Sequence, residues 1–431
     1  MASPNLSAAQ KGALDRILAD AVASKITPAL FLGVTTVDGP IYMHQAGTKL
    51  VDDPQSAAIN EDTVFWLCSQ TKLITTVHCC PATGRARQDR ARHAGRKRPP
   101  ELANPVVVGT DEDGHPQTRP ATAKITLGHL LNHSSGLSYY NDPALTDANG
   151  VAVPYSHNYK DEDVSTFFKI LKGSHPGVPL NFEPGTNFAY GFSTDCVGFI
   201  VERLSGKSLE QYFKDYIFTP LGITSASFYL TPALKERLLP LSIAKNGLLE
   251  SWKGSPLMPQ DPADVRVHCG GVGIYMSQKD YLNLLRHLLQ IKGSIPLSYL
   301  ESVGRIDTEI YVAGSATAPI LSPASVDSMF TPTLPQTSST NLTNTLNFID
   351  PHLGLPEGSA QFGRGLCVNM VDIPGRRRAG SGAWGGWANT SYFVDPTTGI
   401  AVVFGSQVIP TGDTTHKRLL GVLEREIYAA L

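Results

Sequence analysis

The sequence has no excess of charge of either sign. Its 431 residues carry a net charge of −2, and only 17% of them are charged. A near-neutral chain of this kind argues against a general affinity for nucleic acid or for an acidic membrane surface. It also has no apolar run near the roughly 18–20 residues that a membrane-spanning helix needs. The N-terminal stretch lacks the basic-then-apolar layout of a secretion signal, so we expect a cytoplasmic protein.

Cysteine is scarce in this chain. The six cysteines are scattered without paired spacing, as expected for the reduced thiols of an intracellular protein. His78, Cys79 and Cys80 are adjacent, which is a poor geometry for a single tetrahedral metal site. The sequence therefore predicts neither a metal ion nor another cofactor.

Secondary-structure signals concentrate at the two ends of the chain. A helical pattern in the first 26 residues precedes strand-like runs, and strand-like runs near the C-terminus precede a final helical pattern. We therefore predict an α/β (α+β) fold, in which residues 1–75 and 361–431 build an antiparallel sheet flanked by helices. Residues 76–304 are expected to form an inserted, mainly helical domain. The Ser-, Thr- and Pro-rich residues 305–360 are expected to form a surface excursion.

Ser69-Gln70-Thr71-Lys72 places a serine and a lysine three residues apart. On a helix these two side chains share a face, so the Lys72 amine lies within reach of the Ser69 hydroxyl. A hydroxyl needs a neighbouring base or cation to act as a nucleophile near neutral pH. Desolvation in the apolar wall formed by "FWLC" and "LI" is expected to lower the pKa of Lys72. Alone the pattern is weak, because a solvent-facing serine and lysine occur by chance in many helices.

Five further segments occur in a fixed order after this pair. They are "LLNHSSGL" from Leu130, "PGTNFAYGF" from Pro184, "TPLGI" from Thr219, "GGVGIYM" from Gly270 and "GSGAWGGW" from Gly380. Together they resemble the serine hydrolases with the class C β-lactamase fold, a family that includes penicillin-binding proteins, esterases and acyltransferases. The resemblance runs from the first helix to the last and fails only at residues 77–98 and 305–360. It implies a β-lactamase/transpeptidase-like architecture.

The resemblance implies roles for three side chains. Ser69 would be the acylated nucleophile, and Lys72 would assist its deprotonation. Tyr190, from the motif Pro-Gly-x4-Tyr, would act as the general base or acid that carries the proton to the leaving group. A phenol acts as a base near neutral pH only where positive charge favours the phenolate, and Lys72 supplies that charge. The alternative is that Tyr190 is a packed aromatic residue.

The resemblance also implies an oxyanion hole. The backbone N–H groups of Ser69 and Trp387 would form it, with Trp387 following the strand motif Trp384-Gly385-Gly386. The glycines of that motif could instead only mark a tight strand. His133, in "LLNHSSGL", is expected to be a structural, hydrogen-bonded residue rather than a catalytic base.

Two motifs depart from those of β-lactamases. β-Lactamases and penicillin-binding proteins of this fold usually have Lys-Thr/Ser-Gly on the strand, where this chain has Trp384-Gly385-Gly386 with neither charge nor hydroxyl. They often have Tyr-x-Asn, where Tyr190-Gly191-Phe192 has an aromatic in place of the amide. Both changes remove polar ligands for a β-lactam or a D-Ala-D-Ala peptide. The pattern is similar instead to family esterases and to fungal polyketide-pathway acyltransferases of the lovastatin side-chain transesterase type.

This resemblance indicates a serine acyltransferase or transesterase that works without a cofactor. It would take an acyl group from a carrier-protein or coenzyme A thioester onto Ser69 and pass it to an alcohol of a small secondary metabolite. The alternatives are a carboxylesterase that hydrolyses small esters, a non-catalytic binding protein on this fold, and a catalytically impaired gene product. Neither nucleic acid nor a membrane is expected as a partner.

Residues 77–98 do not fit the rest of the chain. They hold seven basic residues and one acidic residue, a net charge of +6, which leaves −8 for the remainder. The resemblance requires here the continuation of the apolar helix that begins at Ser69. The degenerate codons of His78 to Lys97, read from the second base of each, permit "IAALQLVERGKIELDTPV", an amphipathic helix with a glycine stop and a turn.

We infer that this segment is out of frame. One extra base near codon 78 and one missing base near codon 99 would produce it, through a sequencing or gene-model error or a real lesion in the gene. A nuclear-localisation or nucleic-acid patch at Arg96-Lys97-Arg98 is one alternative, and a tolerated disordered loop is the other. If residues 77–98 are out of frame, they cast doubt on the activity of the chain as written.

Overall fold

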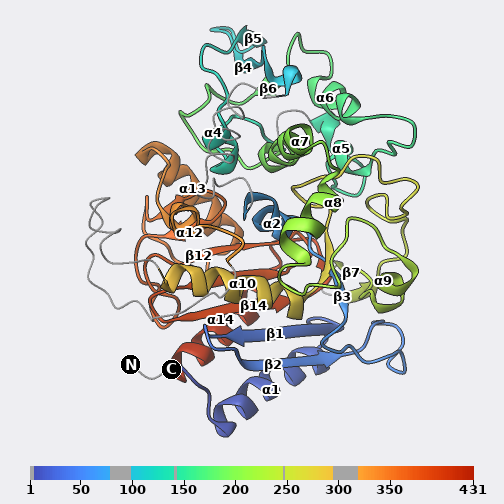
Figure 1. Ribbon diagram of the computed structural model, residues 1–431, viewed down its shortest axis with the longest axis vertical. Helices are drawn as coiled ribbons and strands as arrows, with labels where there is room; N and C mark the ends of the chain where they lie inside the picture. Colours follow the sequence, from blue (N-terminus) through green and yellow to red (C-terminus); the bar gives the residue numbers. More distant parts are fainter. Residues whose placement is uncertain (1–3, 78–98, 140–142, 246–247, 295–318) are drawn as a thin grey trace.

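The computed structural model describes residues 4–77, 99–139, 143–245, 248–294 and 319–431 (Figure 1). At its centre lies a seven-stranded sheet in the order β10-β11-β12-β13-β14-β1-β2, with every neighbouring pair antiparallel. Its strands are β1 (Ala29–Thr35), β2 (Pro40–Gly47), β10 (Ala360–Phe362), β11 (Cys367–Asn369), β12 (Gly382–Gly385), β13 (Ser391–Asp395) and β14 (Ile400–Gly405). Both ends of the chain build this sheet, so the predicted fold class is confirmed.

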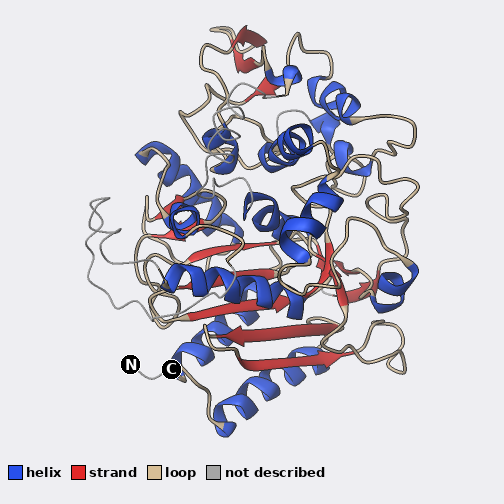
Figure 2. Cartoon of the chain, in the orientation of Figure 1, coloured by secondary structure: helices blue, strands red, loops and turns tan. Residues whose placement is uncertain are grey.

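The sheet is covered on both faces (Figure 2). Helices α1 (Ala8–Ala23) and α14 (Thr414–Ala429) pack against one face, and α10 (Gln278–Gly293) packs against the other. Strand β1 is therefore buried along its whole length, with Leu30 and Leu32 in the core under α1 and α14 and Phe31 in the core under α10. A strand buried on both faces reads as a continuous apolar run, which is what "ALFLGVT" is.

The first helix begins at a capping box. Ser7 and Gln10 form a reciprocal capping box, in which each side chain accepts a backbone N–H at the start of α1. Leu14, Leu18 and Ala21 are buried at helical spacing against the sheet. The amphipathic helix predicted from the first 26 residues is confirmed.

The middle of the chain forms a second, largely helical region above the sheet (Figure 1). Its helices are α4 (Leu127–Leu131), α5 (Val153–Ser156), α6 (Val164–Lys172), α7 (Ser193–Ser205), α8 (Leu209–Phe213) and α9 (Pro232–Arg237), with a π-helical turn at Lys214–Phe218. Short strands form three small sheets, two of which join the middle of the chain to its ends: β4 (Val106–Thr110) with β5 (Pro116–Pro120) and β6 (Pro179–Leu180), β3 (Val64–Trp66) with β9 (Tyr275–Ser277), and β7 (Ser242–Lys245) with β8 (Leu248–Ser251) and β15 (Val408–Ile409). Of these short strands the sequence reading anticipated only β15, within the strand-like runs near the C-terminus.

The structure differs from the expected surface excursion within residues 319–360. Two helices, α12 (Pro323–Phe330) and α13 (Gln336–Ile349), bury Val326, Met329 and Leu342 in the core. Their serine and threonine content suggested a loop, but these hydroxyls are satisfied inside the fold. Ser339 Oγ donates to the Ala360 carbonyl at 2.7 Å, and Thr343 Oγ1 accepts the Ala360 N–H at 3.0 Å. Helix α13 thus supplies polar partners to the edge strand β10, which an apolar helix could not do.

Two predictions lie outside the described residues. The out-of-frame segment falls there apart from Val77, and so does the part of the expected excursion before residue 319. Within the described part of the chain, no helix combines the length and apolar character needed to cross a membrane.

Candidate active site

Ser69 lies at a sharp turn between a buried strand and a short helix. Strand β3 pairs with β9 and runs into a 3₁₀ turn at Cys68–Gln70, which continues as α2 (Thr71–Val77). Cys68 has a φ of +49°, in the left-handed region that costs a non-glycine residue on the order of 1 kcal/mol. The turn places Ser69 at the wall of a cavity with 8% of its surface exposed.

The lysine of the Ser-x-x-Lys pair faces the serine, as the spacing predicts. Lys72 is only 3% exposed, and its Nζ donates to Ser69 Oγ at 3.1 Å. It also donates to the Tyr139 hydroxyl at 3.1 Å and to the Gly271 carbonyl at 2.9 Å. An ammonium group has three protons, so these three acceptors use all of them.

The charge of Lys72 differs from the sequence expectation. Burial alone would lower the pKa of its amine, but the oxygens of Tyr139 and Tyr190 and the carboxylate of Asp195 together raise that pKa above its usual value. The expectation of a lowered pKa considered only the apolar wall and is therefore wrong. Lys72 is an ammonium ion near neutral pH, so it can act on Ser69 as a cation and not as a free amine base.

Tyr190 lies beside this cation and beside strand β12. The Lys72 Nζ is 4.7 Å from the centroid of the Tyr190 ring. The indole Nε1 of Trp384 donates to the Tyr190 hydroxyl at 3.0 Å, and the two rings are 5.0 Å apart. The structure therefore brings together Ser69, Lys72 and Tyr190, as the resemblance implied. It also gives Trp384 a contact to the tyrosine that the sequence reading did not assign.

The glycines of the strand motif allow β12 to approach the Ser69 turn. A Cβ at Gly386 would lie 2.5 Å from the Leu67 carbonyl and 2.3 Å from Thr390 Oγ1, and a Cβ at Gly385 would lie 2.6 Å from the Thr390 carbonyl. Neither position has room for a side chain. This close approach puts Trp387 on the same cavity wall as Ser69.

Trp387 packs at the rim of that wall. Its ring meets Trp66 edge-on at 6.2 Å. Burial raises the pKa of the Cys68 thiol to about 12, although the neighbouring backbone groups of Ala388 and Trp387 lower it. The end of β12 therefore lies against the turn that carries Ser69, where the oxyanion hole is predicted.

Tyr139 is the active-site residue that the sequence reading missed. It is the second residue after the motif "LLNHSSGL", and no neighbouring charge marks it. Its backbone N–H donates to the Tyr190 carbonyl, and a Cβ at Gly191 would lie 2.5 Å from the Leu137 carbonyl. Gly191 thus allows the two tyrosine-bearing segments to pack closely. Phe192, which stands where the amide of Tyr-x-Asn would be, is buried. Its ring centroid lies 4.8 Å from that of Tyr139.

His133 is a buried neutral residue behind Tyr190. Its ring contacts those of Tyr190 at 5.1 Å and Phe362 at 5.2 Å. Burial, together with the Lys72 cation, lowers the pKa of His133 to about 3. Its Nδ1 has no hydrogen-bond partner among the described residues. The expected hydrogen bond is thus not found at Nδ1, and the ring supports Tyr190 by packing.

The cavity beside Ser69 is smaller than about 380 Å³, because the space of that volume is also lined by Leu32, Phe404 and Ile427 on the opposite face of the sheet. Ser69, Tyr139, Tyr190, Trp384 and Trp387 line it, and so do apolar side chains from several elements: Trp66, Met258, Leu346, Ile349 and Leu353. Helix α13, which supplies Leu346 and Ile349, therefore forms part of the wall rather than only covering it. A site of this size and character suits a small, largely apolar ligand.

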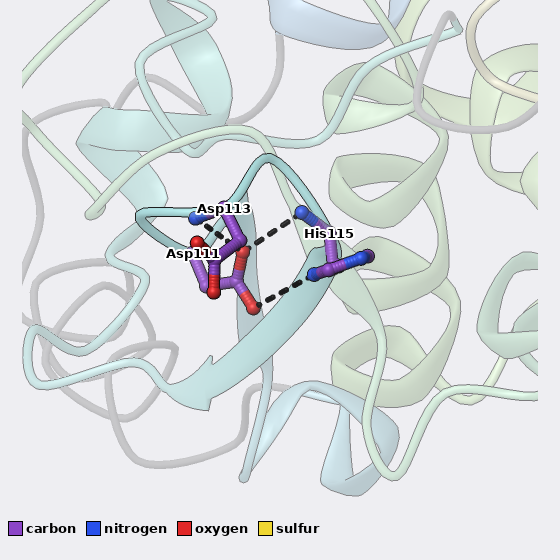
Figure 3. A group of neighbouring side chains, drawn as sticks. All are labelled: Asp111, Asp113 and His115. Carbon is purple, nitrogen blue, oxygen red and sulfur yellow. Dashed lines mark hydrogen bonds and ion pairs between the residues drawn. The ribbon is translucent and has the colours of Figure 1, made fainter.

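In the described residues, one cluster of three side chains brings potential metal-ligand atoms within 4.8 Å of one another. Asp111, Asp113 and His115 lie together at the turn between β4 and β5, and all three are exposed (Figure 3). Asp111 Oδ1 accepts the N–H groups of Asp113 and His115, so its carboxylate stabilises the turn itself. The cluster lies at the top of the helical region, away from α2 (Figure 1).

The fold and these residues define a class of protein. A buried Ser-x-x-Lys helix beside a tyrosine, on an antiparallel sheet covered by helices, is the arrangement of a serine acyltransferase or hydrolase of the β-lactamase type. The chain belongs to the beta-lactamase family, whose model matches residues 14–420.

Named relatives agree with this assignment. The chain is 29% identical to the monacolin J acid methylbutanoyltransferase of Aspergillus terreus, over 87% of this chain and 84% of that protein. It is 28% identical to the lovastatin esterase of Penicillium rubens, over 90% of each. Its fold matches that of a mutant simvastatin synthase from Aspergillus terreus with a TM-score of 0.75 and 26% identity, over 98% of this chain and 95% of that one. The predicted similarity to fungal acyltransferases and esterases is confirmed.

Proposed function

We propose that the protein moves an acyl group, through an ester on Ser69, to an alcohol of a small secondary metabolite. The observation that carries this proposal is the 3.1 Å hydrogen bond from the Lys72 ammonium to Ser69 Oγ at the wall of an apolar cavity. A cation at that distance favours the developing alkoxide, and the cavity offers apolar walls to the acyl chain. The relatives named as a methylbutanoyltransferase and an esterase support acyl transfer in general.

The first half of the reaction loads the serine. Ser69 Oγ bonds to the acyl carbonyl carbon while its proton passes to the phenolate of Tyr190. The indole N–H of Trp384 and the cation of Lys72 both face Tyr190 and favour that phenolate. The backbone N–H groups of Ser69 and Trp387 would hold the oxyanion. The bond to the leaving group then breaks, and Tyr190 returns the proton to the departing thiolate.

The second half transfers the acyl group. The acceptor hydroxyl gives its proton to Tyr190 and attacks the ester carbonyl, and Ser69 leaves and regains the proton. The donor would be a carrier-protein or coenzyme A thioester, since a thiolate is a good leaving group. The cytoplasm of a fungus, where such thioesters are made, is the expected location, and neither nucleic acid nor a membrane takes part.

Hydrolysis is the second candidate function. The specific observation in its favour is the 28% identity to a lovastatin esterase over 90% of both chains. Water in place of the alcohol completes the same cycle, so the two functions differ only in which acceptor reaches the ester. A third outcome is a catalytically impaired protein, because the sequence of residues 77–98 departs from the apolar helix that the resemblance implies.

The test is acylation followed by intact mass. The chain is incubated with a small acyl thioester, and an adduct of one acyl group is expected, which Ser69→Ala abolishes. Adding a small apolar alcohol should discharge the adduct faster than buffer does if transfer is the function, and no faster if hydrolysis is. An adduct that still forms on the Ser69→Ala variant would contradict the proposal. If the adduct forms only after residues 78–97 are replaced by the recovered string, the chain as written is the impaired form.

A further inference from the structure

A chain of hydrogen bonds leads from Lys72 to a buried carboxylate that the proposed mechanism does not use. Lys72 Nζ contacts the Tyr139 hydroxyl at 3.1 Å, which contacts the Tyr155 hydroxyl at 2.9 Å. Tyr155 in turn donates to Asp195 Oδ2 at 2.7 Å. Asp195 is fully buried at the start of α7, and Tyr155 is 6% exposed on α5. Three separate segments of the helical region therefore meet behind the catalytic lysine.

The direction of these hydrogen bonds follows from the proton count. Lys72 has donors only, so Tyr139 accepts from it. Tyr155 donates its single hydroxyl proton to Asp195, so it can only accept from Tyr139. Tyr139 therefore donates its own hydroxyl proton to Tyr155. Both tyrosine hydroxyls in this series of hydrogen bonds therefore point away from the ammonium ion and toward the carboxylate. Such a chain holds each member in one orientation and strengthens its neighbours by polarisation.

The second oxygen of Asp195 reaches Lys72 by another route. Asp195 Oδ1 accepts the Gly271 N–H at 2.8 Å, and the Gly271 carbonyl accepts the third proton of Lys72 at 2.9 Å. A Cβ at Gly271 would lie 2.6 Å from Asp195 Oδ2, so only glycine allows this approach. One carboxylate therefore fixes two of the three acceptors of Lys72, and the remaining acceptor is Ser69 Oγ.

We propose that Asp195 and Tyr155 are positioning residues of the active site, which act through Tyr139 and Gly271 to fix the Lys72 ammonium group against Ser69. The role in acyl transfer rests on the proposed function, whereas the physical coupling of Asp195 to Lys72 does not. Neither side chain hydrogen-bonds to Ser69 Oγ, and both determine where the Lys72 ammonium group is held. This explains why a carboxylate is buried where no cation of the described residues forms an ion pair with it.

The charges around Lys72 agree with this role. The titratable groups that face it are Tyr139, Tyr190, Asp195, Cys68 and His133. Burial raises the pKa of Asp195, while Lys72, Tyr155 and the Gly271 N–H oppose that rise. Asp195 is the carboxyl group of the set, and its charge raises the pKa of Lys72, so the two groups are coupled behind the two phenols. Replacing Asp195 by a neutral group would lower the pKa of Lys72.

The kinetic test compares three variants. Tyr155→Phe is expected to slow Ser69 acylation by about tenfold with KM within a factor of two, because the cation loses its fixed position while the aromatic ring that Tyr155 contributes to the cavity wall is kept. Tyr42→Phe is the matched control, since Tyr42 is also 6% exposed and donates to Asp15 at 2.8 Å on the far side of the sheet. The Tyr42→Phe variant should match the parent rate.

Asp195→Asn should lower the pH at which the rate falls at the alkaline end by about one unit or more, because activity needs protonated Lys72. Equal rates for the two tyrosine variants, or an unmoved alkaline limb, would overturn the proposal.

A second measurement keeps the inference testable if the chain transfers no acyl group. In denaturant unfolding, Asp195→Asn should lower the folding equilibrium constant at least tenfold more in the parent than in Lys72→Met, because only the parent is left with an unbalanced buried cation. Tyr42→Phe should have the same effect in both backgrounds. Absence of an acyl adduct with this coupling intact counts against the proposed function alone. Additive effects of Asp195→Asn and Lys72→Met contradict the positioning role itself.

Discussion

Trp384 donates its indole N–H to the hydroxyl of Tyr190 at 3.0 Å. Trp384 lies on β12, where the resemblance to β-lactamases would place a lysine, and Tyr190 follows the Pro-Gly-x4-Tyr motif. The indole is a neutral donor, so it can stabilise a phenolate without attracting a substrate carboxylate. The same residue therefore supports the proposed proton carrier and leaves the cavity apolar, which fits an ester or thioester better than an anionic peptide.

Removing that N–H should weaken the proposed base and little else. Trp384→Phe keeps an aromatic ring against Tyr190 and Phe362, which lie 5.0 and 5.4 Å from the indole, but it has no donor. We expect acylation of Ser69 to slow by about tenfold, which is the effect of one hydrogen bond to a charged group. Stopped-time intact mass measures the rate. Trp252→Phe is the control, because its indole donates only to the Ser255 carbonyl of its own loop. A parent-like rate for Trp384→Phe would show that the indole N–H has no part in proton transfer.

Gly386 should be as sensitive as a catalytic residue although it has no side chain. A Cβ there would lie 2.5 Å from the Leu67 carbonyl and 2.3 Å from Thr390 Oγ1, so β12 would have to move away from the Ser69 turn. We expect Gly386→Ala to reduce acylation by about a hundredfold, since small displacements of an oxyanion hole are costly. Gly12→Ala, in α1 where an added Cβ would meet only Arg16 Nη1 at 3.9 Å, should leave the rate unchanged and stabilise the helix by about 1 kcal/mol. Equal activity of the two variants would remove the argument for an oxyanion hole at this strand.

His133 should make the fold sensitive to acid. The folded protein holds its pKa near 3, whereas the unfolded chain takes up a proton near 6.5. Between these values the unfolded state binds more protons, so the free energy of unfolding decreases as the pH falls, by about 2 kcal/mol from pH 7 to pH 5. His133→Asn removes this contribution and keeps a residue type that tolerates the observed φ of +59°.

The measurement is urea unfolding of this variant at the two pH values. His287, whose pKa is lowered to about 4 by burial and by Arg286, and His129, whose pKa is lowered by burial, contribute losses of the same sign, so His133→Asn should remove about a third to a half of the pH dependence. The exposed His115 provides the control, and His115→Asn should keep the full dependence. If His133→Asn keeps it too, the histidine is protonated in the folded protein and the stated burial effect is wrong.

The sequence could predict the parts of this site that depend on local spacing. Ser69 and Lys72 share a helical face because three residues make about one turn, and the glycines of β12 mark a close approach. Tyr139, Tyr155 and Asp195 could not be found in this way, because each comes from a different segment and only tertiary packing brings the hydroxyls together. The pKa of Lys72 was misjudged for the same reason, since its direction depends on those partners. Helix α13 was missed because hydroxyls that satisfy the edge of β10 look like a loop in the sequence.

The out-of-frame segment gives the last prediction. The described part of α2 runs from Thr71 to Val77 and all seven of these residues are buried, so the Ser69 turn depends on what packs around this helix. A protein in which residues 78–97 become the 18 residues "IAALQLVERGKIELDTPV" followed by the parental Arg96 and Lys97 should melt several degrees higher than the chain as written. It should also acylate Ser69 at least tenfold faster, because an apolar helix continuing from α2 restores a packed support for the nucleophile. Replacing the same residues by a Gly- and Ser-rich stretch of equal length is the control, which should show neither gain. If the chain as written equals the recovered version in melting temperature and rate, the basic segment belongs to the protein and the frame inference is wrong.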